Sequence, residues 1–267
     1  MEITLILGIV VSAVLGLTGA GGGILAVPAL VSGMGWSMQQ AAPVALIAVA
    51  GGAALGAVEG LKKGLVRYKA ALVMVISGLP LTSAGVRVAN ILPQRWLLGA
   101  FALVMLIVAG RLLRQACMAA SGVAAEDAAW VRLDSTTGRF HWSWTTASLF
   151  VSIGALTGFM TGLLGVGGGF VIVPMLRRFT NMSMHGIVAT SLLVIALVGS
   201  GGVVAAVVHG IALPLQTTAL FALATAIGML LGRKLASRIV ERHVQLGFSL
   251  VLILVALGLI YKATFNS

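Results

Sequence analysis

The chain has 267 residues, of which 60% are hydrophobic and only 9% are charged. With a mean hydropathy of +1.12, it cannot be a water-soluble domain, so its solvent must be lipid. The formal net charge of +11 does not indicate nucleic acid, because basic residues beside apolar spans usually mark the cytoplasmic face of a membrane.

The first predicted element is an apolar segment broken by glycines. Residues 5–15 and 24–30 are each too short to cross a bilayer, and the Gly-Ala-Gly-Gly-Gly run at 19–23 cannot hold a stable helix. Unpaired backbone in a membrane is tolerated only inside protein or beside a wet cavity, so we expect a buried or solvated break here. The alternative is that these glycines serve helix packing, as we expect for the spaced residues Gly52, Gly56 and Gly60.

Three ordinary spans follow, then a polar linker, and then the same order of elements again. We predict a first membrane repeat at 1–114, a polar cytoplasmic linker at 115–143 and a second membrane repeat at 144–267. The ordinary spans are predicted at 41–61, 70–90, 96–113, 186–208, 211–232 and 244–261.

An internal repeat supports this division. A shift of 146 residues places 16–30 on 162–176 with nine of fifteen residues identical, and Ser37-Met38 on Ser183-Met184. It also places Gly64 on Gly210, and after one inserted residue the alignment continues. The chain therefore reads as two homologous halves.

Basic residues predict the orientation of the halves. If each broken segment enters the membrane and returns as a pair of short helices, 14 of the 17 Lys and Arg residues fall on one side. Only Arg87, Arg95 and Lys262 then face outward, together with both chain ends. We therefore predict an all-α integral membrane protein of two inverted repeats, each a Gly-broken helical hairpin plus three transmembrane helices.

Breaks at corresponding positions of two inverted halves point to a shared central site. Backbone N–H groups where helices begin near Ile24 and Phe170 would face an anion. A hydroxyl in a membrane helix often bonds its own backbone instead. The predicted anion-binding residues are Gly21, Gly22, Gly23, Gly167, Gly168, Gly169, Thr18, Thr190, Ser191 and Arg87.

Charged residues add little chemistry. Arg87 could meet an anion on its exit path or simply snorkel to the interface, and Glu59 is expected to pair with Lys62 or Lys63. His209 is expected in a short outer loop. We expect no metal and no cofactor, because the histidines lack ligand spacing, the single cysteine excludes a cysteine-based site, and dinucleotide and P-loop motifs fail.

The glycine-proline motifs resemble the TauE/SafE family of sulfite and organosulfur-anion exporters. The matching residues are Gly-Ala-Gly-Gly-Gly-Ile-Leu-Ala-Val-Pro-Ala-Leu at 19–30 and Gly-Val-Gly-Gly-Gly-Phe-Val-Ile-Val-Pro-Met-Leu at 165–176. This resemblance implies export of a small sulfur-containing anion across a prokaryotic cytoplasmic (inner) membrane. Pro43-Val44-Ala45 stands where the second half has Ala189-Thr190-Ser191, so the halves would contribute unequal polar contacts.

We therefore expect a secondary transporter with alternating access. A non-transporting anion-responsive receptor or scaffold and an anion channel are the alternatives. An enzyme is not expected, because no clustered acid, base or nucleophile lies near the glycines. The expected partners are the anion and the lipid bilayer, while the identity of the anion, the coupling ion and homo-oligomer formation are left open.

Overall fold

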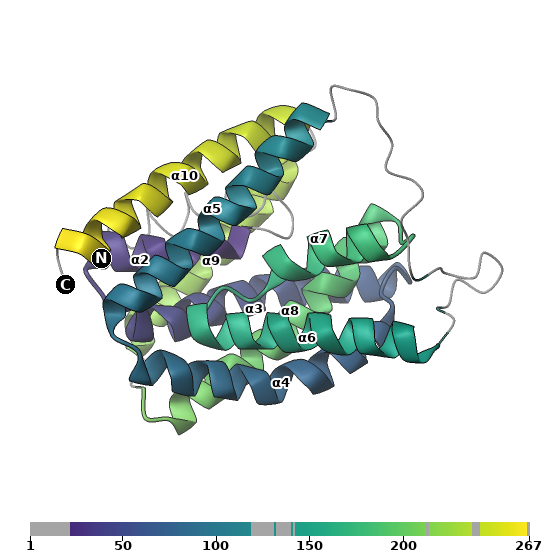
Figure 1. The fold of residues 1–267 in the computed structure, drawn as a ribbon, viewed down its shortest axis with the longest axis horizontal. Coiled ribbons are helices and arrows are strands. Elements are labelled where there is room, and N and C mark those ends of the chain that lie inside the picture. Colours follow the sequence, from purple (N-terminus) through teal and green to yellow (C-terminus); the bar gives the residue numbers. More distant parts are fainter. Residues whose placement is uncertain are drawn as a thin grey trace.

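The computed structural model describes residues 22–118, 131, 140, 142–211, 214–236 and 241–265. Most of these residues are helical, and one isolated bridge joins Val131 and Thr180. The predicted all-α class is confirmed for the described part of the chain (Figure 1). The elements are η1 (Gly22–Leu25), α2 (Ala26–Met34), α3 (Met38–Lys62), α4 (Tyr68–Ile91), α5 (Gln94–Met118), α6 (Trp144–Leu164), α7 (Gly169–Phe179), α8 (Met184–Val208), α9 (Leu215–Ala236) and α10 (Glu241–Phe265).

Six of the described helices, α3, α4, α5, α6, α8 and α10, are long and apolar enough to cross a membrane. The protein is therefore multi-pass. Five of the predicted spans coincide with helices of this set, while the predicted span at 211–232 begins later, at Leu215 in α9. The left-handed Gly210 (φ 80°) turns the chain after α8, and Pro214 immediately precedes α9, a position that suits proline.

The expected pair of short helices is wrong for the second half. α6 has 21 residues and can span a bilayer, whereas α7 has 11. The chain nevertheless reverses at the glycines between them, and α7 runs back alongside α6 (Figure 1). At its far end, the Phe179 carbonyl accepts a hydrogen bond from the Val131 N–H at 3.0 Å.

The duplicated sequence produces duplicated helices. Moved by 146 residues, α3 takes the bounds of α8, and moved by 147 residues, α5 takes the bounds of α10. The N-terminal caps agree as well, because the hydroxyls of Ser37 and Ser183 accept hydrogen bonds from the N–H groups of Gln40 and Gly186 at 3.3 and 3.2 Å. The predicted internal repeat thus has a structural counterpart.

α3 and α8 pack against each other in antiparallel fashion. A Cβ built on Gly60, near the end of α3, would lie 2.7 Å from the Cβ of Ala189, near the start of α8. A Cβ on Gly199 would lie 3.1 Å from Ala50. We call the end of the bundle where α3 ends and α8 begins the inner end, and the opposite end the outer end. An antiparallel relation is what inverted halves require, and inversion of the whole halves stays a prediction.

α6 is held against α4 by glycines whose backbones touch. A Cβ on Gly154, Gly158 or Gly162 would collide with the backbone of Met74, Gly78 or Thr82, so the two helices run parallel. Small residues four apart are typical of close helix contacts in membranes, where buried apolar side chains gain little over lipid. This contact fixes the depth of α6 within the bundle.

Candidate functional site

The two glycine breaks meet halfway along the α3–α8 pair. A Cβ on Gly23 would lie 2.9 Å from the Val166 carbonyl oxygen and 3.1 Å from Val49. A Cβ on Gly167 would lie 3.0 Å from Val49 and 3.1 Å from Ile195. Val49 and Ile195 are each the twelfth residue of a 25-residue helix and correspond by the 146-residue shift. The breaks therefore lie together near the middle of the bundle.

The start of α7 is built from left-handed glycines. Gly165, Gly167 and Gly168 have φ angles of 73°, 74° and 69°, a conformation that costs other residues about 1–2 kcal/mol. Gly168 is the N-cap and provides no side-chain cap, and its carbonyl accepts from the Val171 N–H at 2.9 Å. The N–H groups before Val171 come too early to bond within α7, so the positive end of the helix dipole is available to an anion.

Two threonines of α6 face this helix start. Thr157 and Thr161 are one turn apart and 0% exposed, and their hydroxyls have no hydrogen-bond partner. A Cβ built on Gly168 would lie 3.0 Å from Thr161 Oγ1 and would overlap the methyl group of Thr157. Unpartnered buried hydroxyls cost about 1–3 kcal/mol each, so they are expected where a ligand binds.

Many other hydroxyls in the described helices are satisfied locally. Thr82, Thr180 and Ser200 donate to carbonyls four residues earlier, at 2.9, 2.7 and 2.7 Å. Arg67 Nε and Thr225 Oγ1 are the other buried polar atoms without a partner in the described part of the chain. Thr157 and Thr161 were not among the predicted binding residues. The repeat does contain a signal for them, because apolar residues, Val11 and Leu15, stand at the corresponding positions of the first half.

The predicted hydroxyls of α8 are already engaged. Thr190 accepts from the Arg67 N–H at 3.0 Å, and Ser191 donates to the Val188 carbonyl at 2.8 Å. These bonds tie α8 to the α3–α4 connection and to its own backbone. A role for either hydroxyl in anion binding stays a prediction, while Thr18 and Gly21 lie outside the described residues.

The predicted charged residues lie at the ends of the bundle. Arg87 is exposed near the outer end of α4, and its Nε donates to Nε2 of His209 at 3.3 Å. At the inner end, Lys63 pairs with Glu59 at 2.7 Å, which confirms the expected ion pair. Within the described residues, no three His, Cys, Asp or Glu side chains gather as a metal site.

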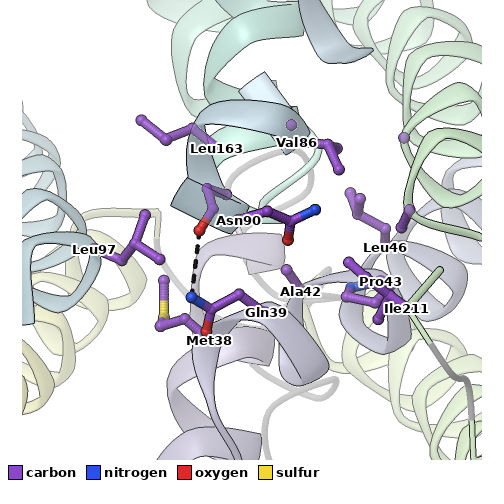
Figure 2. A pocket seen from close by; sticks show the side chains of 14 residues that line it. Met38, Gln39, Ala42, Pro43, Leu46, Val86, Asn90, Leu97, Leu163 and Ile211 are labelled. Carbon is purple, nitrogen blue, oxygen red and sulfur yellow. Dashed lines mark hydrogen bonds between the residues drawn. The ribbon is translucent and has the colours of Figure 1, made fainter. Parts of the chain in front are cut away.

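A cavity lies at each end of the α3–α8 pair. The outer cavity is lined by Gln39, Ala42, Leu46, Asn90 and Gly162, among others, and the Gln39 amide donates to the Ala89 carbonyl at 3.3 Å (Figure 2). The inner cavity is larger, with a volume of about 390 Å³, and its lining includes Glu59, Lys63, His185, Ala189 and Leu192.

Six described helices that can span a membrane, with Gly23 and Gly167 both in contact with Val49 near the middle of the bundle, define a multi-pass membrane protein. The model of the sulfite exporter TauE/SafE family matches residues 4–259, and the chain belongs to this family. Membership supports a membrane transporter and is consistent with the absence of an enzymatic role.

Curated relatives extend over much or all of the chain. The "Probable membrane transporter protein YunE" of Bacillus subtilis (strain 168) is 27% identical over 276 residues, which cover 99% of this chain and 98% of that protein. A "Probable membrane transporter protein" of Xylella fastidiosa (strain 9a5c) is 28% identical over 186 residues, covering 69% of this chain and 66% of that protein. No solved structure matches the chain significantly.

Proposed function

We propose that the protein is a secondary transporter that exports small sulfur-containing anions, sulfite or organosulfonates, across the cytoplasmic membrane of a prokaryote. The observation that supports this best is the meeting of the two helix breaks beside Val49 and Ile195, where the start of α7 faces the unpartnered hydroxyls of Thr157 and Thr161. The proposed class of substrate follows the description of the matching family, sulfite exporter.

The chemistry of this place suits an oxyanion. Hydroxyl O–H groups and the N–H groups of Gly168 and Gly169 are neutral donors, and the dipole of α7 adds a partial positive charge. Sulfite and sulfonates present several acceptor oxygens that such donors can share. The side chains nearest to Gly23, Gly167 and Gly168 are the uncharged Val49, Ile195, Thr157 and Thr161, so the donors that we propose are neutral. Weak, neutral binding lets a carrier release its substrate.

The test is flux in liposomes. Purified protein is reconstituted, and sulfite flux is measured alongside sulfate and sulfoacetate, with and without an imposed pH gradient. Saturable sulfite flux with exchange against internal sulfite supports a carrier, whereas flux that does not saturate indicates a channel. Sulfite binding without flux indicates a receptor, and the absence of both from folded protein overturns the assignment of sulfite.

A matched pair of variants tests the site. The double variant Thr157→Val, Thr161→Val keeps the shape of both side chains and removes both hydroxyls, so sulfite flux at low concentration should fall about tenfold or more, the usual value of a hydrogen bond to a charged group. Its thermal stability should be unchanged or higher, because two unpartnered groups are removed. Thr82→Val is the control, since that hydroxyl bonds its own helix. Equal flux in both variants would exclude the α6 hydroxyls as ligands.

A further inference from the structure

The two cavities are built from corresponding positions of the repeat. Five residues of α3 that line the outer cavity are Met38, Gln39, Ala42, Pro43 and Leu46. The 146-residue shift places them on five residues of α8 that line the inner cavity: Met184, His185, Val188, Ala189 and Leu192.

The agreement extends to the opposite wall. Gly202, Ala206 and Ile211 line the outer cavity, and the same shift relates them to Gly56, Gly60 and Leu65 of the inner cavity. Eight of the ten inner lining residues thus have counterparts in the outer lining, the exceptions being Glu59 and Lys63. Two unrelated surface hollows would not share this set.

The glycine breaks lie between the cavities. On α3, Val49 stands between Leu46 of the outer cavity and Gly56 of the inner cavity, and on α8 Ile195 holds the corresponding place. Since Gly167 contacts both Val49 and Ile195, an anion that moves from one cavity to the other along the α3–α8 pair passes the start of α7.

The cavities differ in size and in chemistry. The inner one has about 390 Å³, whereas the outer one has about 20 Å³, which is room for about one water molecule. The inner lining carries His185 together with Lys63 and Glu59, which pair with each other at 2.7 Å. The outer lining offers the uncharged amides of Gln39 and Asn90 (Figure 2).

We propose that the inner cavity takes up the anion from the cytoplasm and that the outer cavity, its repeat counterpart, releases it, the two opening alternately. The structure is then the inward-open state, with the outer cavity closed around Leu46 and Leu163. This inference rests on the proposed function and adds to it the entry and exit sites. Two related conformations of inverted halves would exchange the volumes of the cavities.

Single cysteines test the exchange. Cys117 is the only cysteine, so Cys117→Ser provides a background in which Ala42→Cys or Val188→Cys is labelled by a membrane-impermeant thiol reagent in vesicles of known orientation. Without anion, Val188→Cys should react quickly from the cytoplasmic side and Ala42→Cys slowly from the opposite side. Sulfite should slow the first and accelerate the second, each by about fivefold or more, the lower range of ligand-driven two-state shifts. The control must be reached from water, so it lies at a helix end: Trp144→Cys, at a position 92% exposed where α6 begins, should be labelled at a rate that sulfite leaves unchanged.

The outcomes separate this inference from the proposed function. Opposite changes at the two cysteines support it, and unchanged or parallel changes in variants that still carry sulfite overturn it while the transporter assignment stands. If the cysteine-free protein carries no sulfur anion, the proposed function fails instead. Labelling of both cysteines from the same side of the membrane, with or without sulfite, also overturns the inference.

Discussion

The long helices α3 and α8 and the short helices α2 and α7 show two degrees of agreement between the halves of the chain. α3 and α8 have corresponding bounds and corresponding serine caps. α2 instead follows a 3₁₀ turn and has Leu25 in a right-handed conformation as its N-cap, whereas α7 begins directly after the left-handed Gly168. The two halves therefore share a framework and differ where the short helices begin, and the donors proposed for the anion lie at the start of α7 and on α6.

The largest expected effect is at Gly168. Gly168→Ala places a Cβ against Thr157 in a backbone conformation that alanine avoids, so we expect loss of sulfite flux and a destabilisation of about 2–5 kcal/mol in thermal unfolding. Gly210→Ala has a similar φ but open space around it, and it should cost about 1–2 kcal/mol and keep its flux. Equal behaviour of the two would remove the special role given to the start of α7.

The next effect concerns the support of α6, which carries the two threonines. Gly158→Ala drives a Cβ into the backbone of Gly78, and we expect a loss of about 1–3 kcal/mol from overpacking. Gly99→Ala on α5 meets nothing within 4 Å and should be neutral or slightly stabilising. Thermal unfolding in detergent measures both, and a stable Gly158→Ala protein would contradict the close contact of α4 and α6.

The shared framework is tested at its caps. Ser37→Ala and Ser183→Ala each remove the hydroxyl that accepts from the first turn of α3 or α8, so each should cost about 1 kcal/mol. The two shifts in melting temperature should be nearly equal, and neither should change the order of preference among sulfite, sulfate and sulfoacetate. Clearly unequal shifts would mean that the two helices are less alike than their bounds indicate.

The smallest effect on stability is expected at the Glu59–Lys63 ion pair, which has no counterpart in the second half. Glu59→Gln breaks the contact with Lys63, whose side chain is 61% exposed, while the Glu59 side chain is 53% exposed. Pairs this exposed contribute about 0.5 kcal/mol or less. The second half has Ala205 at the corresponding position, and its helix α8 forms without such a pair. A large loss of stability in Glu59→Gln would give this pair a structural role that its exposure does not predict.

Local signals explain how much of the fold was predictable. Serine caps and left-handed glycines act within a few residues, so the positions of α3 and α8 follow from Ser37, Gly64 and their counterparts. The prediction of two short helices is wrong for α6 because this helix continues through Gly158 and Gly162, which pack against the backbone of α4 and do not end it. The sequence window alone does not reveal that 144–164 continues as one helix.

The site depended on contacts between distant segments. The beginning of a helix near Phe170 was predictable from the glycines, and α7 does begin at Gly169. The lack of a hydrogen-bond partner for Thr157 and Thr161 could not be predicted, because any threonine of a membrane helix can donate to the carbonyl four residues earlier. Only the packing of α6 against Gly168 distinguishes these two from Thr82.

The bond between Val131 and Phe179 couples the position of Val131 to the end of α7. Val131 joins the end of that helix through its N–H and through the bridge to Thr180, while the start of the helix faces the interior. Because Val131 is itself only 3% exposed, a displacement of this end of α7 must either carry Val131 with it or break the bond to Phe179.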